Sequence, residues 1–168
     1  MLARLRGLYH YLWALGGAVF YRFPARELTV IGVTGTKGKT TTVELINAIL
    51  EARGEKTALA STLRVKIGPV SEPNQLKMTM PGRAYLQCFL RQAVNNNCRF
   101  AIIEMTSEGA RQFRHRFIDL DVLVFTNLAP EHIESHGSYE KYLEAKLAIG
   151  RELARSRKPA PTLIVNGD

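Results

Sequence analysis

The chain has 168 residues, of which 46% are apolar and 23% charged, and its formal net charge at pH 7 is +8. These values are typical of one soluble globular domain with a sizeable core. The basic residues are scattered along the chain, not gathered on one element with aromatic side chains between them, so we expect no nucleic-acid partner. Cys88 and Cys98 have no matching Cys or His pair, which argues against a zinc site or a disulfide framework and for reduced thiols in the cytoplasm.

The first 23 residues predict an aromatic-rich helix. Arg4 and Arg6 precede an apolar run over residues 8–21, which is shorter than the ~20 residues that span a bilayer and contains His10. No clear cleavage signal follows the run, so we do not interpret it as a signal peptide. Two placements stay open for this helix: docked on the domain, or lying on a membrane surface. Pro24 ends it, and we divide the chain into an N-terminal helix over 1–27 and a domain over 28–168.

The most informative motif is a glycine-rich loop at residues 32–42, Gly-Val-Thr-Gly-Thr-Lys-Gly-Lys-Thr-Thr-Thr. A β-branched apolar run (28–31) precedes it, and apolar residues at mostly helical spacing (43–53) follow it. Gly35 and Gly38 allow the backbone to turn its N–H groups inward, Lys39 supplies a positive charge, and the Thr40 hydroxyl can reach a magnesium ion. The strict phosphate-loop pattern requires glycine at position 33, where this chain has Val33. The loop nevertheless predicts a site for a nucleoside triphosphate.

The remaining elements alternate between strands and helices. We predict strands at 57–61, 65–70, 100–103, 122–125 and 162–165, helices at 81–95 and 138–153, and a polar loop at 71–77. This order predicts an α/β fold, a doubly wound and mostly parallel sheet with helices on both faces. Ligands in such sheets bind beyond the carboxyl ends of the strands.

Polar residues follow two of these strands. Glu104 comes directly after the strand at 100–103, and Glu131 and His132 lie a few residues beyond the strand at 122–125. A carboxylate and an imidazole that converge near a triphosphate loop are reasonable magnesium ligands, and the carboxylate is the stronger candidate because Mg²⁺ prefers oxygen. His115, His132 and His136 all fall in predicted loops, where functional residues concentrate.

Six motifs occur in the order seen in the Mur ligases: Thr34–Thr41, Met78–Gly82, Glu104–Ser107, Phe125–Leu128 with the residues up to 137, Tyr142–Lys146 and Val165–Asp168. The chain resembles the central ATPase domain of that family, and is most similar to the ligases that add the third peptide residue to a UDP-muramyl dipeptide. The resemblance implies that ATP phosphorylates the carboxylate of the UDP-muramyl-peptide precursor and that the amine of an amino acid then displaces phosphate.

The resemblance also assigns residues. It implies that the ATP phosphates are held by Gly35, Thr36, Lys37, Gly38, Lys39, Thr40 and Thr41, with Asn127 near the nucleotide. It implies magnesium ligands Thr40, Glu104 and His132, with His132 and Lys39 also catalytic, and a carbamylated, catalytic Lys146 that serves a second magnesium ion. It implies precursor contacts from Thr79, Thr106, Gln112 and Arg114, the last also plausible because guanidinium pairs well with carboxylate and phosphate.

Departures from the family pattern leave alternatives open. Thr106-Ser107-Glu108 replaces the usual Ser-Ser-His, and Glu131-His132 replaces Asp-His. The first 27 residues cannot build the domain that grips uridine diphosphate, and a C-terminal amino-acid-binding domain is absent from this sequence. We therefore expect a fragment that ligates poorly alone. The alternatives are a related ligase with another acceptor, of the folylpolyglutamate type or one that amidates a lipid-linked precursor, and a non-catalytic nucleotide-binding scaffold.

Overall fold

The chain folds around one seven-stranded, mostly parallel sheet, as a computed structural model describes it for residues 2–76, 78–82, 84–129 and 137–167 (backbone alone for 2–4). The strand order is β4-β3-β2-β5-β1-β6-β7. The strands are β1 (Thr29–Thr34), β2 (Thr57–Ala60), β3 (Arg64–Ile67), β4 (Val70–Pro73), β5 (Phe100–Glu104), β6 (Val122–Phe125) and β7 (Thr162–Val165). The helices are α1 (Leu2–Phe20), the 3-10 turn η1 (Pro24–Glu27), α2 (Lys39–Ala52), α3 (Tyr85–Asn95), α4 (Ser107–Arg111) and α6 (Tyr139–Ala154).

Strand β1 lies inside the sheet, between β5 and β6, and runs parallel to both. Its register pairs Val33 with Glu104 on β5 and Thr34 with Phe125 on β6. The carboxyl ends of the three strands therefore meet at one edge of the sheet. The loop after β1, the residues after β6 and Glu104 come together there, as the doubly wound prediction requires.

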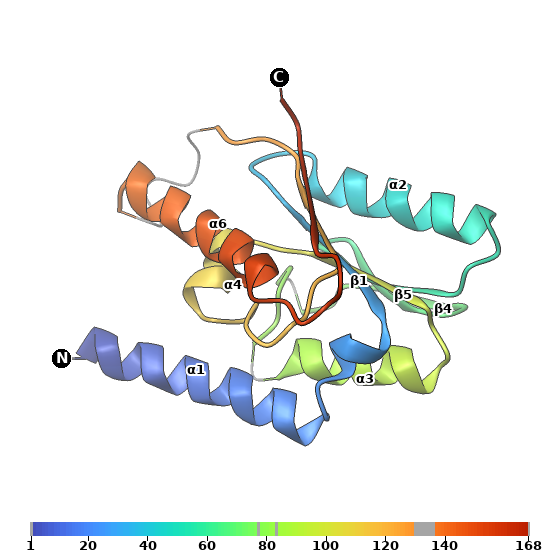
Figure 1. The fold of residues 1–168 in the computed structure, drawn as a ribbon, viewed down its shortest axis with the longest axis horizontal. Coiled ribbons are helices and arrows are strands. Elements are labelled where there is room, and N and C mark those ends of the chain that lie inside the picture. Colours follow the sequence, from blue (N-terminus) through green and yellow to red (C-terminus); the bar gives the residue numbers. More distant parts are fainter. Residues whose placement is uncertain (1, 77, 83, 130–136, 168) are drawn as a thin grey trace.

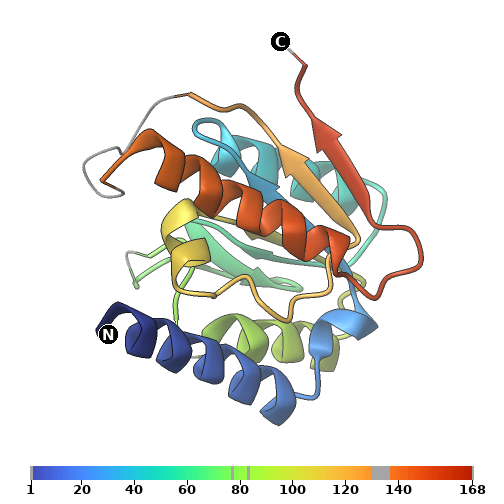
Figure 2. The ribbon, with the colours of Figure 1, turned by 60° about the vertical axis from the view of Figure 1, so that its left-hand side comes forward.

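Helices cover both faces of the sheet, which confirms the predicted fold class (Figures 1 and 2). On one face α2 packs Val43 against Leu59 and Ile102. On the other face α3 and α6 contribute buried residues such as Leu90 and Ile149 to the larger core cluster. Both layers form because the parallel strands carry apolar residues on both sides, so each face needs a helix to bury it.

Two local predictions were wrong. The predicted strand at 65–70 is interrupted at Gly68, whose φ is +57°, and the chain turns there into β4, so part of the expected loop at 71–77 is an edge strand. The helix expected from residue 81 begins only at Tyr85, because Ala84 has a φ of +65°, a left-handed conformation that an α-helix does not contain. Met80 and Gly82 instead lie against the Arg114 side chain.

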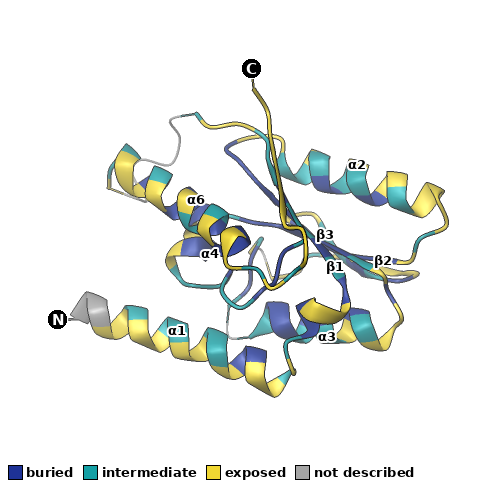
Figure 3. Ribbon diagram, in the orientation of Figure 1, coloured by how far each residue is buried: buried dark blue, intermediate teal, exposed yellow. Residues whose placement is uncertain are grey.

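Helix α1 lies outside the α3 layer and does not reach the sheet (Figure 1). Its Tyr11 ring makes edge contacts with Phe113 and Phe117, at centroid distances of 5.9 and 5.3 Å. Figure 3 shows that much of this helix is exposed, unlike the strands in the middle of the sheet. The docked placement is therefore the one in this structure, although a broad apolar face of α1 stays uncovered. No helix of the described residues is both long enough and apolar enough to cross a bilayer.

Candidate active site

The glycine loop leaves β1 at the carboxyl edge of the sheet and leads into the N-terminus of α2. Gly35 has a φ of +143°, and a Cβ at this position would lie 2.0 Å from Thr126 Oγ1. Gly38, the residue before α2, has a φ of +78° and open space where a Cβ would be. A helix N-terminus that begins on glycine presents its first N–H groups without a side-chain cap, which is the arrangement that binds anions.

The turn after β6 holds this loop in place. Asn127 Oδ1 accepts hydrogen bonds from the backbone N–H groups of Thr36 (3.2 Å) and Lys37 (2.9 Å), and Asn127 Nδ2 donates to Lys37 O (3.2 Å). Thr126 Oγ1 also donates to Lys37 O, at 2.7 Å. The Asn127 amide is thus a positioning group for the loop, which is more specific than the general placement near the nucleotide that the motif implied.

These bonds divide the loop into two parts. The N–H groups of Thr36 and Lys37 already donate hydrogen bonds to Asn127. A phosphate group would therefore bind the N–H groups at the start of α2. Lys39 lies there and its Nζ donates to Thr36 O at 2.9 Å, which folds the side chain back over the loop. Thr40 and Thr41 lie in the first turn of the same helix.

Helix α6 supports the loop from below. Its Tyr142 hydroxyl is 2.7 Å from Thr36 Oγ1, and its Lys146 Nζ donates to Gly35 O at 2.6 Å. Lys146 is only 2% exposed and lies 4.9 Å from the centre of the Tyr142 ring. The structure therefore brings Lys146 from 111 residues away to the phosphate loop, and its carbamylation stays a prediction.

A chain of short contacts runs from the loop to a second cluster of predicted residues. Glu104 Oε2 accepts hydrogen bonds from Thr40 Oγ1 (3.0 Å), from Thr62 Oγ1 (3.1 Å) and from the Thr62 backbone N–H (2.9 Å). The Thr62 hydroxyl is in turn 2.8 Å from Thr79 Oγ1. Thr62 was not singled out from the sequence, and only its position after a predicted strand offered a signal. Glu104 is 2% exposed, so its carboxylate is fixed by these partners.

Thr79 forms part of a pocket of about 280 Å³ beside Glu104, which we call the acceptor pocket. All four residues predicted to contact the precursor line it: Thr79, Thr106, Gln112 and Arg114. Arg114 donates hydrogen bonds to Met80 O and, at 2.5 Å, to Gln112 Oε1. The Thr106 hydroxyl accepts a hydrogen bond from the Gly109 N–H at 3.1 Å and so caps the short helix α4. This side chain therefore also stabilises the fold.

The histidine predictions have different outcomes. Glu131, His132 and His136 lie outside the described residues, so the predicted roles of His132 stay predictions. His115 is buried and 3% exposed, and burial lowers its pKa to about 4, with a further contribution from the Arg116 and Arg155 charges. Its Nδ1 has no hydrogen-bond partner among the described residues, and it lines neither the phosphate loop nor the acceptor pocket.

The described residues contain no cluster of three His, Cys, Asp or Glu side chains. Thr40 Oγ1 and Glu104 Oε2 lie 3.0 Å apart at the loop, and both are oxygen atoms of the kind that magnesium binds together with phosphate oxygens and water. An oxygen pair of this kind fits magnesium. In this mostly parallel sheet, the interior strand β1 is followed by a glycine loop and then by a helix that begins with Lys39 and Thr40. This arrangement defines the class of P-loop nucleotide-binding domains.

Comparison with known proteins identifies the family. Residues 33–168 match the Mur ligase middle domain. The chain is 40% identical over 138 residues to the UDP-N-acetylmuramyl-tripeptide synthetase of Treponema pallidum, a match that covers 81% of this chain and 26% of that protein. It is 41% identical over 152 residues to the UDP-N-acetylmuramoyl-L-alanyl-D-glutamate–2,6-diaminopimelate ligase of Geobacillus kaustophilus, covering 89% of this chain and 31% of the relative. The chain belongs to the Mur ligase family.

Solved structures agree on the fold. A structure of a UDP-N-acetylmuramoyl-L-alanyl-D-glutamate–2,6-diaminopimelate ligase superposes with a TM-score of 0.69 at 29% identity, covering 84% of this chain and 27% of that one. A Mycobacterium tuberculosis folylpolyglutamate synthase gives a TM-score of 0.68 at 15% identity, covering 92% of this chain and 41% of the other. The backbone alone therefore does not separate the two predicted acceptor classes.

Proposed function

We propose that this chain is the nucleotide- and acceptor-binding part of an ATP-dependent amide ligase that extends a UDP-muramyl peptide by one amino acid. The names of the relatives at about 40% identity support this substrate class. The single observation that carries the proposal is the hydrogen-bonded series Thr40–Glu104–Thr62–Thr79, which joins the phosphate loop to the acceptor pocket. Phosphoryl transfer requires its two reactants to be held in line at short range, and this series links the two sites.

The proposed reaction has two steps. A carboxylate oxygen of the precursor forms a bond to the γ-phosphorus of ATP while the bond to the ADP oxygen breaks, which yields an acyl phosphate and ADP. The amine of the amino acid then attacks the acyl carbon, phosphate leaves with the C–O bonding pair, and the amine loses a proton. Lys39 would offset charge on the transferred phosphoryl group, and Arg114 would hold the anionic precursor in the acceptor pocket.

Magnesium would neutralise phosphate charge during the transfer, with Thr40 and Glu104 as its protein ligands. Glu104 fits this role because its carboxylate is preset by three hydrogen bonds. His132 is the further proposed ligand, on the basis of the motif alone.

We further propose that Lys146 is carbamylated in the working enzyme. Its Nζ lies against the Gly35 carbonyl, at the phosphate loop, so an added carboxylate would bring negative charge close to the metal ions there. The test is a ¹³C NMR spectrum of the protein in ¹³C-bicarbonate. A carbamate signal that Lys146→Arg removes would support the modification, and the same spectrum in both proteins would refute it.

The apolar outer face of α1 supports peripheral membrane contact as an additional property. Leu5, Leu8, Leu12 and Val19 are each more than half exposed, and Phe20 is 77% exposed. The sequence before Glu27 contains arginine but no acidic residue. An apolar helix face with basic neighbours is the pattern that binds anionic lipid surfaces.

Nucleotide binding tests the central proposal. Isothermal titration of the chain with a non-hydrolysable ATP analogue and Mg²⁺ should give a measurable Kd, and Lys39→Ala should weaken it by about 100-fold because a charged hydrogen bond to phosphate is lost. Lys56→Ala is the matched control, since Lys56 is exposed and precedes β2, at the amino end of the parallel strands and away from the phosphate loop. Flat titrations of the folded wild-type chain would overturn the proposal.

The two alternative functions have separate tests. Titration with a UDP-muramyl dipeptide and with a folate, in the presence of the nucleotide analogue, distinguishes the muramyl acceptor from the folylpolyglutamate type. A non-catalytic scaffold would keep its biological activity after Lys39→Ala, whereas the ligase should lose nearly all of it. A complementation assay in cells that depend on the gene measures this difference.

A further inference from the structure

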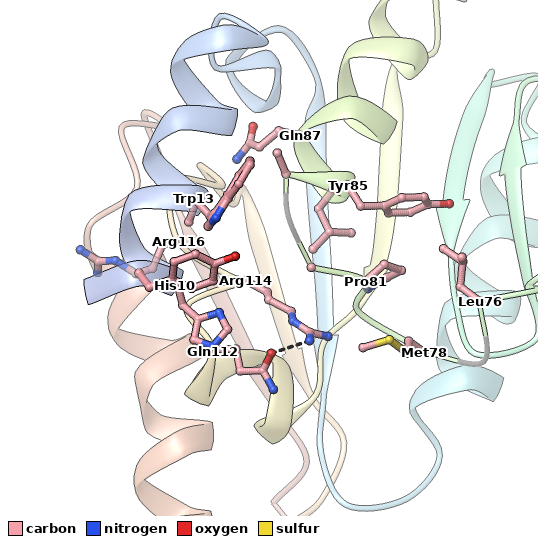
Figure 4. A pocket seen from close by; sticks show the side chains of 15 residues that line it. His10, Trp13, Leu76, Met78, Pro81, Tyr85, Gln87, Gln112, Arg114 and Arg116 are labelled. Atoms are coloured by element: carbon pink, nitrogen blue, oxygen red, sulfur yellow. Dashed lines mark hydrogen bonds between the residues drawn. The ribbon is translucent and has the colours of Figure 1, made fainter. Parts of the chain in front are cut away.

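A second and larger cavity, of about 580 Å³, lies between helix α1 and a wall formed by the described residues Leu76, Met78, Pro81, Gly82 and 84–87, and we call it the α1 cavity. It shares Met78, Gln112 and Arg114 with the acceptor pocket, so the two compartments adjoin. Figure 4 shows His10 and Trp13 on the α1 side, Met78 and Pro81 on the other side, and the Arg114 guanidinium between them. A ligand whose anionic end lies in the acceptor pocket would therefore extend past Arg114 towards α1.

The walls of the α1 cavity are mainly aromatic and apolar. Helix α1 contributes Tyr9 and Trp13, and the opposite wall contributes Leu76, Pro81 and Tyr85. Its volume lies within the range of about 300–1,000 Å³ that is usual for small-molecule sites, which are likewise mostly apolar with a few orienting polar groups. Flat aromatic side chains in such a wall suit a ring with an uncharged face.

The charges around the α1 cavity limit what it can hold. Arg116 is paired with Glu152 at 2.7 Å, and burial lowers the pKa of His10, an effect to which the nearby Arg114 and Arg6 charges add. Both effects favour the neutral imidazole of His10 over the imidazolium. Arg114 is the remaining cation among the described lining residues, and no Asp or Glu is among them. A guanidinium at the junction with the acceptor pocket suits a ligand whose carboxylate end lies there and whose neutral body lies against the aromatic wall.

One wall residue also needs a hydrogen-bond donor. Gln87 lines the α1 cavity and is 4% exposed, and its Nε2 donates to Phe117 O at 3.2 Å. Its Oε1 has no partner among the described residues. A buried acceptor without a partner is costly, so a ligand hydroxyl or amide N–H that reached Gln87 Oε1 would offset that cost.

We propose that the α1 cavity holds the neutral N-acylated sugar ring of the acceptor, with Trp13 and Tyr9 as positioning residues and Arg114 at the junction with its carboxylate-bearing peptide. This inference rests on the proposed function and extends it. Helix α1 then completes the acceptor site from the N-terminal side of the chain, and the nucleotide diphosphate of the precursor lies outside the cavity.

The experiment compares the Kd of three acceptors for the 168-residue chain, with Mg²⁺ and a non-hydrolysable ATP analogue present. They are L-alanyl-D-glutamate, its N-acetylmuramoyl derivative and the UDP-linked form of that derivative. Wild-type protein should bind the muramoyl peptide at least about tenfold more tightly than the dipeptide, because the ring contacts the aromatic wall. Trp13→Ala, and Ala14→Phe, which fills the α1 cavity, should each abolish that gain and leave dipeptide binding unchanged.

Leu12→Ala is the matched control, since Leu12 is 54% exposed on the same helix and does not line the α1 cavity. Near-ultraviolet circular dichroism of each variant checks that the fold is intact. Equal affinity for dipeptide and muramoyl peptide in wild type would overturn the inference while leaving the proposed function in place. A gain that appears only with the UDP-linked form and is lost in Trp13→Ala would also overturn it, since the cavity would then hold the nucleotide. No binding of any acceptor would overturn the proposed acceptor and the inference with it.

Discussion

The phosphate loop and helix α1 are stabilised in different ways. The loop is tied to the rest of the domain by polar contacts from far along the chain, through Asn127, Tyr142 and Lys146. Helix α1 is attached through aromatic edges and leaves several large apolar side chains in solvent. The comparison indicates that nucleotide binding depends on a fixed backbone geometry in the loop. Helix α1 instead has exposed apolar surface that a bound partner or ligand would stabilise by burying it.

Gly35→Ala should give the largest effect and tests the fixed geometry of the loop. A Cβ at this position would lie 2.0 Å from Thr126 Oγ1 and 3.1 Å from Asn127 N, at a φ of +143°. We expect a loss of about 2–4 kcal/mol in the free energy of unfolding and no detectable nucleotide binding. Urea denaturation and calorimetric titration measure the two effects. Gly38→Ala is the control, because open space surrounds its Cβ and only backbone strain remains; equal effects would contradict this account.

The free energy of unfolding measured at several pH values tests how the buried His115, in the segment that packs against α1, contributes to stability. Because the folded protein holds the pKa of His115 at about 4 and the unfolded chain near 6.5, the unfolded state binds more protons below pH 6.5. Its contribution to stability is complete above pH 6.5 and is lost as the pH falls towards 4, by about 2 kcal/mol at pH 5. Urea denaturation at pH 7.5 and pH 5 should show this loss in wild type and a smaller one in His115→Gln. The same pH dependence in both proteins would rule out this role.

Asn127→Ala tests whether the loop needs its polar support. Removing the amide leaves the Lys37 N–H without this partner, while the Thr36 N–H keeps only the Asn127 backbone carbonyl, which should weaken nucleotide binding by about tenfold and cost about 1–2 kcal/mol of stability. Asn127→Asp keeps the acceptor oxygen but places a negative charge near the phosphates. We therefore expect Asn127→Asp to retain more stability than Asn127→Ala while binding nucleotide no better, and an unchanged Kd in both variants would argue against the positioning role.

The smallest stability effect is expected on the outer face of α1. Leu8→Ser with Leu12→Ser should change the free energy of unfolding by less than about 0.5 kcal/mol per site, because both side chains are more than half exposed. The same pair should lower co-sedimentation with phosphatidylglycerol vesicles by about tenfold or more, since apolar insertion is lost. Vesicles of phosphatidylcholine are the control for charge. Unchanged binding to anionic vesicles would exclude this face as the membrane contact.

Local patterns in the chain were enough to predict its local chemistry. The glycine loop between an apolar strand and a helix, the order of strands and helices, and the Ser138 cap of α6 all follow from short-range patterns, and the structure has them where they were expected. The six motifs likewise identified the family, because they occur in a fixed order. Short-range rules did not find the β3–β4 hairpin or helix α4, since a turn at Gly68 and a five-residue helix carry little periodic signal.

Which distant groups come into contact depends on the packing of the strands and helices against one another. Thr62 links Glu104 to Thr79 because the parallel register brings the ends of neighbouring strands together, and no spacing within the chain contains that information. The α1 cavity has the same origin: residues 9–14 and 112–116 are about a hundred positions apart and become neighbours only when α1 packs on the folded domain. Sequence patterns report contacts within one element, whereas a site is formed by contacts between elements, and burial of apolar surface selects those contacts.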